Sequence, residues 1–491
     1  MLRTRRTRFM NVLFLALSVA FLFVADFRWG LQMPVLDWAL ASERPERAAW
    51  LLPSPSAVRS LANEAETQRN AEGLAFAALH WPQAESAEKF RLAEQAVSLD
   101  PGLAWIYFHV ASQYQPWPAN PAVRERIPKW TEALEAADPG NALAALTRAE
   151  LARAEAGDWP TGPAIEQKRD GLWERALWRQ QMERAFGAPR YNTYGVARFD
   201  LERRVLREKG WATPATVVSS ILGYGLPDLR GVREFADLQV NRSAAQAERD
   251  GRRQEALKLY AQASAFGRIL RQDGTTLIEH MVGNEIELLA SKPLAGLLDR
   301  DGRGDEAALL RGRVQELGAR GGGLQTREFY ARSAVPAWTA FTLLFSSFVV
   351  VLLAVLALVT LAYTNAVNWI RRGEHGRLYN ITTIAENYVA VGLFVACAAV
   401  YLLYAPYANN FRSFMSTSSP DAQYLETLLY NIYPGTVVAR GALPFSTPFR
   451  NYVPWALAAF VVAALIAAWG ELRWRRAARA EQPKAAAANA G

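Results

Sequence analysis

The sequence predicts an all-α protein in which a domain of repeated helix pairs is attached to four transmembrane helices. Four long apolar runs indicate the membrane helices, and Asp-Pro stops between helical patterns indicate the helix pairs. No clear run of alternating apolar and polar residues, the pattern of a half-buried strand, interrupts this organisation. At 491 residues the chain is long enough to form more than one hydrophobic core.

The four predicted transmembrane helices lie at residues 10–25, 334–364, 385–407 and 452–470. The last three runs are long enough to span a membrane, since about 20 apolar residues cross the hydrocarbon core. The first run is shorter and follows an arginine-rich start, so a cleaved signal peptide is the competing interpretation. An uncleaved anchor is favoured, because Phe23 and Ala25 do not form the small-x-small pattern of a cleavage site.

The net charge of +8 is concentrated beside the apolar runs. Basic residues crowd the tail at 1–9, the loop at 365–384 and the low-complexity tail at 471–491, whereas residues 9–333 are about neutral. Lys and Arg mark the cytoplasmic ends of membrane helices. We therefore expect both termini and the 365–384 loop in the cytoplasm, with residues 26–333 and 408–451 outside. This distribution does not predict a groove for nucleic acid.

Cysteine usage and composition suggest the cellular location. Cys397 is the one cysteine and lies within the third predicted span, so neither an intramolecular disulfide nor a lipid-bearing cysteine is expected. The richness in Ala and Arg is typical of a bacterial protein. We expect a multi-pass protein of the bacterial inner membrane with a large periplasmic domain.

Helix-pair repeats are expected within residues 26–333. The stop at Asp100-Pro101 separates two helical patterns, and the second pattern carries Tyr107, Ala111 and Tyr114. The same stop recurs at Asp138-Pro139. A third unit is expected at residues 240–263. Alternation of large and small side chains allows two antiparallel helices to pack closely, and proline ends the helix before it.

These residues resemble the tetratricopeptide repeat family. The likeness rests on the small-aromatic-small pattern of Ala256, Tyr260 and Ala263 and on the closing Asp-Pro stops. The chain departs from the family at Ala111, where glycine is commoner, and in the third unit, which lacks a closing proline. The resemblance implies stacked helix pairs whose first helices form a concave groove that binds peptides or helices of other proteins.

The resemblance also implies which side chains face that groove. They are Trp105, Phe108, Ser112, Leu146, Glu150, Asn241 and Glu248. The alternative is that Trp105 and Phe108 fill the core between neighbouring helices. The sequence alone leaves both open.

No local motif for catalysis is present. The chain has four histidines, no two of which have the spacing of metal ligands, and it contains no HExxH, CxxC, GxSxG or phosphate-binding loop. We therefore expect no enzyme activity from a local motif, no metal site and no cofactor. Glu386, at the mouth of the third span, is the acidic group nearest membrane depth, so a role at the membrane interface stays open.

Two connecting segments complete the prediction. Gly318 to Gly323 are expected to form a flexible joint before the second span. Within the external loop, residues 419–435 are expected to form an amphipathic helix that lies on the membrane or docks on the repeat domain.

The leading functional hypothesis is an integral membrane scaffold whose periplasmic domain binds other envelope proteins. Its expected partners are those proteins, through the groove, and membrane lipid. The alternative is an accessory subunit of a membrane enzyme or transporter that handles envelope polymers. A signalling receptor is disfavoured, because the tail of about 20 residues has no room for an output domain.

Overall fold

The computed structural model describes residues 2–41, 53–114, 120–155, 171–222, 224–320, 343–344, 347–359, 362 and 377–416. Every regular element in these ranges is helical, which confirms the all-α class. The chain forms two compact units. We call Met1–Glu46, Ser333–Ala408 and Pro434–Gly491 the terminal unit, and Arg47–Arg332 with Asn409–Tyr433 the central unit.

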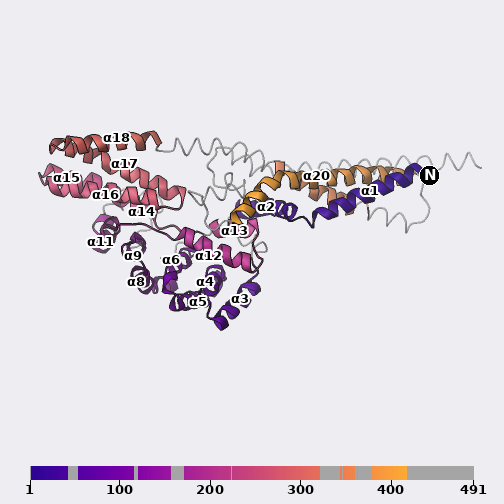
Figure 1. Ribbon diagram of the computed structural model, residues 1–491, viewed down its shortest axis with the longest axis horizontal. Coiled ribbons are helices and arrows are strands. Elements are labelled where there is room, and N and C mark those ends of the chain that lie inside the picture. The colour runs from indigo at the N-terminus through magenta and orange to yellow at the C-terminus, as the bar shows by residue number, and fades with distance from the viewer. Residues whose placement is uncertain are drawn as a thin grey trace, which may run out of the picture. The chain divides into compact units, whose positions relative to one another are not determined.

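The central unit is a series of helices that pack on their neighbours along the chain (Figure 1). Its longer helices are α3 (Pro55–Gln68), α4 (Ala71–His80), α5 (Ser86–Leu99), α6 (Ile106–Ser112), α8 (Ile127–Ala137), α9 (Ala142–Glu155), α11 (Ala176–Phe186), α12 (Gly195–Glu208), α13 (Pro214–Leu222), α14 (Leu229–Leu238), α16 (Arg253–Asp273), α17 (Leu277–Arg300) and α18 (Gly304–Arg320). Short helical segments join them: α7 (Pro121–Arg124), η5 (Gln239–Ala244) and α15 (Ala245–Arg249).

Polar caps determine where many of these helices begin and end. The Asn70 side chain accepts a hydrogen bond from the Gly73 amide at 3.0 Å, which starts α4. At the first predicted stop, Asp100 ends α5 and its carboxylate accepts from the Gly102 amide at 2.9 Å. Asp138 likewise ends α8, and its carboxylate accepts a hydrogen bond from the Asn141 side chain at 3.0 Å. The Asp-Pro stops are therefore real helix boundaries.

Small residues form the contacts between the paired helices. Ala93 and Ala96 of α5, Ala111 of α6, and Ala256 and Ala263 of α16 are all buried, as the large-small alternation predicts. Small side chains let helix backbones approach closely, so larger neighbours can fill the remaining space.

The closest approach within the central unit is between α16 and α17. A Cβ added to Gly267 would lie 2.4 Å from the Glu287 backbone nitrogen, and one added to Gly283 would lie 2.4 Å from the Arg271 nitrogen. The Glu287 carboxylate is fully buried and forms two ion pairs. The Nε atom of Arg271 of α16 lies 2.9 Å from one of its oxygens, and the Nε atom of Arg313 of α18 lies 3.2 Å from the other. One carboxylate thus holds three helices together.

The terminal unit contains α1 (Leu2–Phe21), α2 (Ala25–Ala41) and α20 (Arg377–Ser416), whose last residues belong to the central unit. One helix in the described part of the chain, Val389–Ser413, is long and apolar enough to cross a membrane. Residues Val12–Phe21 and Ala25–Met33 make a second candidate only if the pair, bent by 78°, counts as one span. The apolar helix Ser347–Val359 is shorter.

Aromatic side chains join α1 to α20 within the terminal unit. Phe394 of α20 lies with its ring centre 5.4 Å from that of Phe14 and 6.0 Å from that of Phe21. Several apolar side chains of the same two helices, including Val12, Val395 and Leu402, remain exposed. An apolar seam with an apolar outer surface is the arrangement expected for helices in lipid.

Several predicted boundaries are different in the structure. The first helix begins at Leu2 and breaks at residues 22–24, whereas a single helix was expected at 10–25. The third predicted span, 385–407, belongs to a helix that runs from Arg377 to Ser416, so parts of both flanking loops are helical. The first residues of the predicted glycine joint are also helical, because α18 continues to Arg320. The predicted span at 452–470 and the amphipathic helix at 419–435 lie outside the described residues.

Candidate functional site

Most of the residues predicted to face a groove are buried. Trp105, Phe108 and Ser112, at and within α6, are at most 5% exposed. Leu146 and Glu150 of α9 are each 3% exposed. An open groove formed by these five side chains is therefore not present.

The two remaining groove candidates lie in the third predicted unit. Asn241 is exposed and donates to the Asp237 carboxylate at 2.7 Å. Glu248 is half-buried and pairs with Arg300, while its other oxygen accepts from Tyr260 at 3.3 Å. Both side chains therefore bind groups of the central unit itself.

We call the side of α6 that carries Trp105 and Ser112 its inner face. A later part of the same chain covers this face. The Trp105 ring stacks on Tyr194, just before α12, with ring centres 6.4 Å apart. A Cβ added to Gly225, after α13, would lie only 1.8 Å from the Ser112 hydroxyl, so the backbone there presses on α6. The chain itself occupies the predicted groove, which is why these side chains are buried.

Helix α9 packs on α8 and α11, and its Arg153 side chain connects it to α14. Arg153 of α9 is 3% exposed and contacts Asp228 at 2.6 Å and Glu234 at 3.0 Å. Asp228 also caps α14, because its carboxylate accepts from the Gly231 amide at 3.0 Å. Leu146 lies in the same core cluster as the apolar residues of α14.

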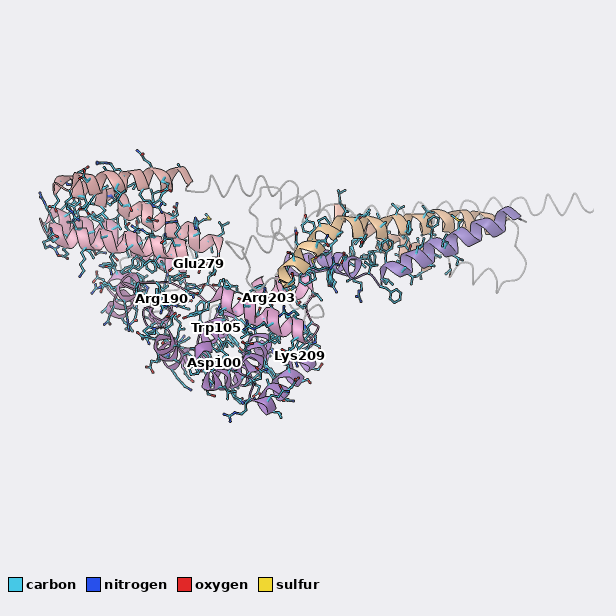
Figure 2. All side chains as sticks on the ribbon, viewed as in Figure 1. Asp100, Trp105, Arg190, Arg203, Lys209 and Glu279 are labelled. Atoms are coloured by element: carbon cyan, nitrogen blue, oxygen red, sulfur yellow. The ribbon has the colours of Figure 1, made fainter. Side chains whose placement is uncertain are left out.

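Helix α12 brings charged side chains into the interior. It lies beside α4 and α6 (Figure 1), and its buried residues include Arg198, Glu202 and Arg203. Figure 2 labels Arg203 on this helix, with Trp105 and Lys209 near it. A buried charge is costly unless a partner compensates it, so the contacts of these groups decide what the region can do.

The centre of this interior is a buried ion pair with two histidines around it. The Arg198 Nε donates to the Glu202 carboxylate at 3.0 Å, and both side chains are almost fully buried. His80 of α4 lies 3.4 Å from the same carboxylate oxygen, and His109 of α6 has its Nδ1 3.5 Å from Arg198. We call Arg198, Glu202, His80 and His109 the buried polar cluster.

The electrostatics of the cluster keep Glu202 ionised and His109 neutral. Burial alone would raise the pKa of Glu202, but Arg198 and His80 outweigh it and lower the pKa to about 2. Burial and the charge of Arg198 lower the pKa of His109 well below its usual value. Arg198 and Glu202 therefore form a matched pair of opposite charges beside a neutral His109.

Exposed ion pairs surround this cluster and join α12 to α3 and α4. Arg204 donates to Glu72 of α4 at 2.7 Å, and Lys209, just after α12, contacts Glu64 of α3 at 2.9 Å. We call these two contacts the rim pairs. Their side chains are partly or largely exposed, so each pair contributes little by itself.

A buried lysine lies next to the cluster. Lys89 of α5 is 1% exposed and donates to the Trp81 carbonyl at 3.1 Å and to the Gln113 side chain. Burial and nearby Arg198 lower the pKa of Lys89 to about 7. Both hydrogen bonds are made within the protein. Lys89 thereby links α5 to Trp81, just after α4, and to Gln113, just after α6.

Another buried carboxylate, that of Glu279, fixes the start of α17. Glu279 accepts from the amides of Thr275 and Thr276 at 2.9 and 2.8 Å and from the Tyr191 hydroxyl. Burial raises the pKa of Glu279. The Thr276 side chain completes the capping box, so Glu279 acts as a helix cap whose contacts reach the segment before α12.

The structure locates one further sequence candidate and offers no metal site in the part it describes. Glu386 lies in α20, three residues before the candidate span Val389–Ser413, and its side chain is outside the description. Among the described residues, no group of three or more His, Cys, Asp or Glu side chains is placed to hold a metal ion.

Sequence patterns did not reveal the buried polar cluster. Its one local signal is the spacing of Arg198 and Glu202, four residues apart on one helix face, which is equally typical of a solvated surface. The contributions of His80 and His109 come from helices far away in the sequence. No protein-family model, curated protein or solved structure matches this chain.

Proposed function

We propose that this protein is a membrane-anchored scaffold whose helix pairs bind helical segments of other envelope proteins. One observation carries the proposal: the inner face of α4 and α6 receives a whole helix, α12, through aromatic stacking and paired charges. Because α12 fills this groove, a partner helix would pack on the outer side of the same helices, where Val196 of α12 is an exposed apolar side chain. The resemblance to tetratricopeptide repeats supports the same use of the first helix of each pair.

The apolar helices support a location of this binding at the cell envelope. The apolar helix Val389–Ser413 and the seam between α1 and α20 fit an integral membrane protein. The arginine-rich segments beside the apolar runs favour cytoplasmic termini and a periplasmic central unit. Bacterial envelope proteins are then the partners within reach.

One observation favours the alternative, an accessory subunit of a membrane enzyme or transporter. Asp26 is 6% exposed and lies at the start of α2, directly after the break in the first apolar helix. Ionisable residues buried near membrane depth often serve transport. Loss of function in an Asp26→Asn variant that still binds its protein partner would favour this alternative.

Photo-crosslinking in native membranes tests the scaffold proposal. A photoreactive residue replaces Val196, an exposed position on α12. A second version carries it at Leu309, an exposed position on α18 far along the chain. We expect a defined envelope protein to crosslink at position 196 and not at 309. Identical products at the two positions, or only lipid at both, would overturn the proposal.

A further inference from the structure

Resting on the membrane anchor of the proposed function, we propose that α2 is an interfacial helix that lies along the outer headgroup layer and contacts phospholipid there. The first apolar segment then crosses the bilayer once, as α1, and turns into the membrane surface. Three features of the terminal unit lead to this inference: the direction of α1 along α20, the bend before α2, and the level at which α2 contacts α20.

Helices α1 and α20 run in the same direction. The ring centre of Phe14 lies 5.4 Å from that of Phe394. Further along both helices, the ring centre of Phe21 lies 6.0 Å from that of Tyr401. Two parallel helices that cross a membrane begin on the same side of it. Arginines cluster at or just before the start of both helices, so both begin in the cytoplasm and reach the outer leaflet at their other ends.

The chain turns sharply where α1 ends. A bend of 78° separates Val12–Phe21 of α1 from Ala25–Met33 of α2, and Figure 1 shows this turn. Leu22 and Phe23, within the turn, are 50% and 82% exposed. Exposed apolar side chains of this size are favourable in lipid and unfavourable in water. Because α1 crosses the bilayer, a helix nearly at right angles to α1 runs close to the membrane plane.

Helix α2 contacts α20 near the outer end of its apolar sequence. A Cβ added to Gly30 would lie 3.0 Å from the Cγ1 atom of Val400 and 3.1 Å from the Cβ atom of Tyr404, so the two helices are close here. The sequence of α20 becomes polar at Asn409 and Asn410, which are both exposed. Tyr404 lies about 7.5 Å along the helix from Asn409, at a rise of about 1.5 Å per residue. Interfacial helices bury their apolar face about 5–10 Å into the boundary between headgroups and acyl chains, so α2 lies at the expected depth.

The side chains of α2 are divided between protein and lipid. Phe27, Gly30 and Met33 share one side of the helix and are buried. Arg28 is exposed and Trp29 is half-buried. Trp side chains prefer the level of the headgroups, and an arginine there can keep its guanidinium among the phosphates. The exposed side of α2 is continuous with the exposed apolar side chains of α1 and α20, so phospholipid is the expected occupant.

Depth-dependent fluorescence quenching on the full-length protein in phosphatidylcholine vesicles tests this inference. Single bimane labels are attached to Arg28→Cys, Val395→Cys or Leu309→Cys in a Cys397→Ser background. Val395 is 57% exposed within the apolar span, and Leu309 is 79% exposed on α18, so these two positions report on the hydrocarbon core and on water. The quencher is a nitroxide on the lipid headgroup or at the middle of the acyl chain.

We expect the label at position 28 to be quenched roughly twofold more strongly by the headgroup nitroxide than by the acyl-chain nitroxide, because α2 lies at the interface. The order should be reversed at position 395. Neither lipid should quench the label at position 309. Circular dichroism should confirm that the three labelled proteins are folded like the wild type.

Equal or stronger quenching by the acyl-chain nitroxide at position 28 would place α2 in the hydrocarbon core, as part of a bent span, and would overturn the inference. Quenching at position 395 without any lipid quenching at position 28 would overturn it as well, because water or protein would then cover α2. Loss of lipid quenching at both positions would remove the membrane anchor and with it the proposed function. Failure of the interfacial helix is therefore distinguishable from failure of the membrane-anchored scaffold.

Discussion

Lys89 links the stability of the central unit to pH. Its pKa is lowered from 10.5 to about 7 by burial and by Arg198. Because the folded pKa lies below the unfolded one, the unfolded state binds more protons at any pH between these two values. The stability attributable to this residue therefore increases as the pH rises from about 7.

We predict that the free energy of unfolding of the full-length protein rises by roughly 1 kcal/mol per pH unit between pH 7.5 and 9 because of Lys89. Urea unfolding at several pH values measures this slope. Lys89→Met should flatten it, whereas Lys129→Met, which replaces a lysine with a 70% exposed side chain, should not. The same slope in wild type and Lys89→Met would contradict the assignment.

The buried ion pair and the rim pairs should differ sharply in their contribution to the free energy of unfolding. Glu202→Gln removes the partner of a buried Arg198 and should lower the free energy of unfolding by about 3–5 kcal/mol. Glu72→Gln removes an exposed partner and should cost no more than about 1 kcal/mol. Chemical denaturation of both variants gives the comparison. Similar losses would mean that the cluster is more hydrated than its burial indicates.

At the scale of helices, the contact of α16 with α17 depends on the absence of two side chains. Gly283→Ala would place a methyl group 2.4 Å from the Arg271 backbone nitrogen, so the helices must separate. We predict a loss of about 1–3 kcal/mol. Gly312→Ala on α18 is the control, since no atom lies within 4 Å of its added Cβ. It should stabilise by up to about 1 kcal/mol, because alanine favours helices. Equal effects in thermal unfolding would contradict the close contact.

Several elements could be predicted because their signals are local. The Asp-Pro stops mark the ends of α5 and α8, since a carboxylate cap and a missing amide act within a few residues. The alanines of the helix pairs are buried as their spacing indicates. The break at residues 22–24 was missed, because the apolar run continues through it without proline or glycine.

The candidate site was predictable only in part, for a physical reason. Five of the seven residues assigned to the groove are buried, because the exposure of a side chain depends on whether another segment of the chain covers it. Helix α12 reads as a solvated helix, because Arg198 and Glu202 have the spacing of a surface pair. Their burial becomes clear only when His80 and His109 are brought beside them by the fold.

At the scale of the whole molecule, the account predicts a membrane protein with its central unit outside the cytoplasm. Cys397 lies in the apolar span, so a membrane-impermeant maleimide should not label it in intact cells. A cysteine at the exposed position 309, in a Cys397→Ser background, should be labelled from outside. Labelling at 309 only after the inner membrane is permeabilised would place the central unit in the cytoplasm.

The most direct test of the central claim, that α12 packs on the inner face of α4 and α6, is hydrogen exchange on the full-length protein. The account predicts that amides of α12 and α4 are protected to a similar degree. In a Glu202→Gln variant, which removes the partner of the buried Arg198, both helices should exchange faster while α17 keeps its protection. If α12 exchanges much faster than α4 in the wild-type protein, α12 does not cover that face and the claim is wrong.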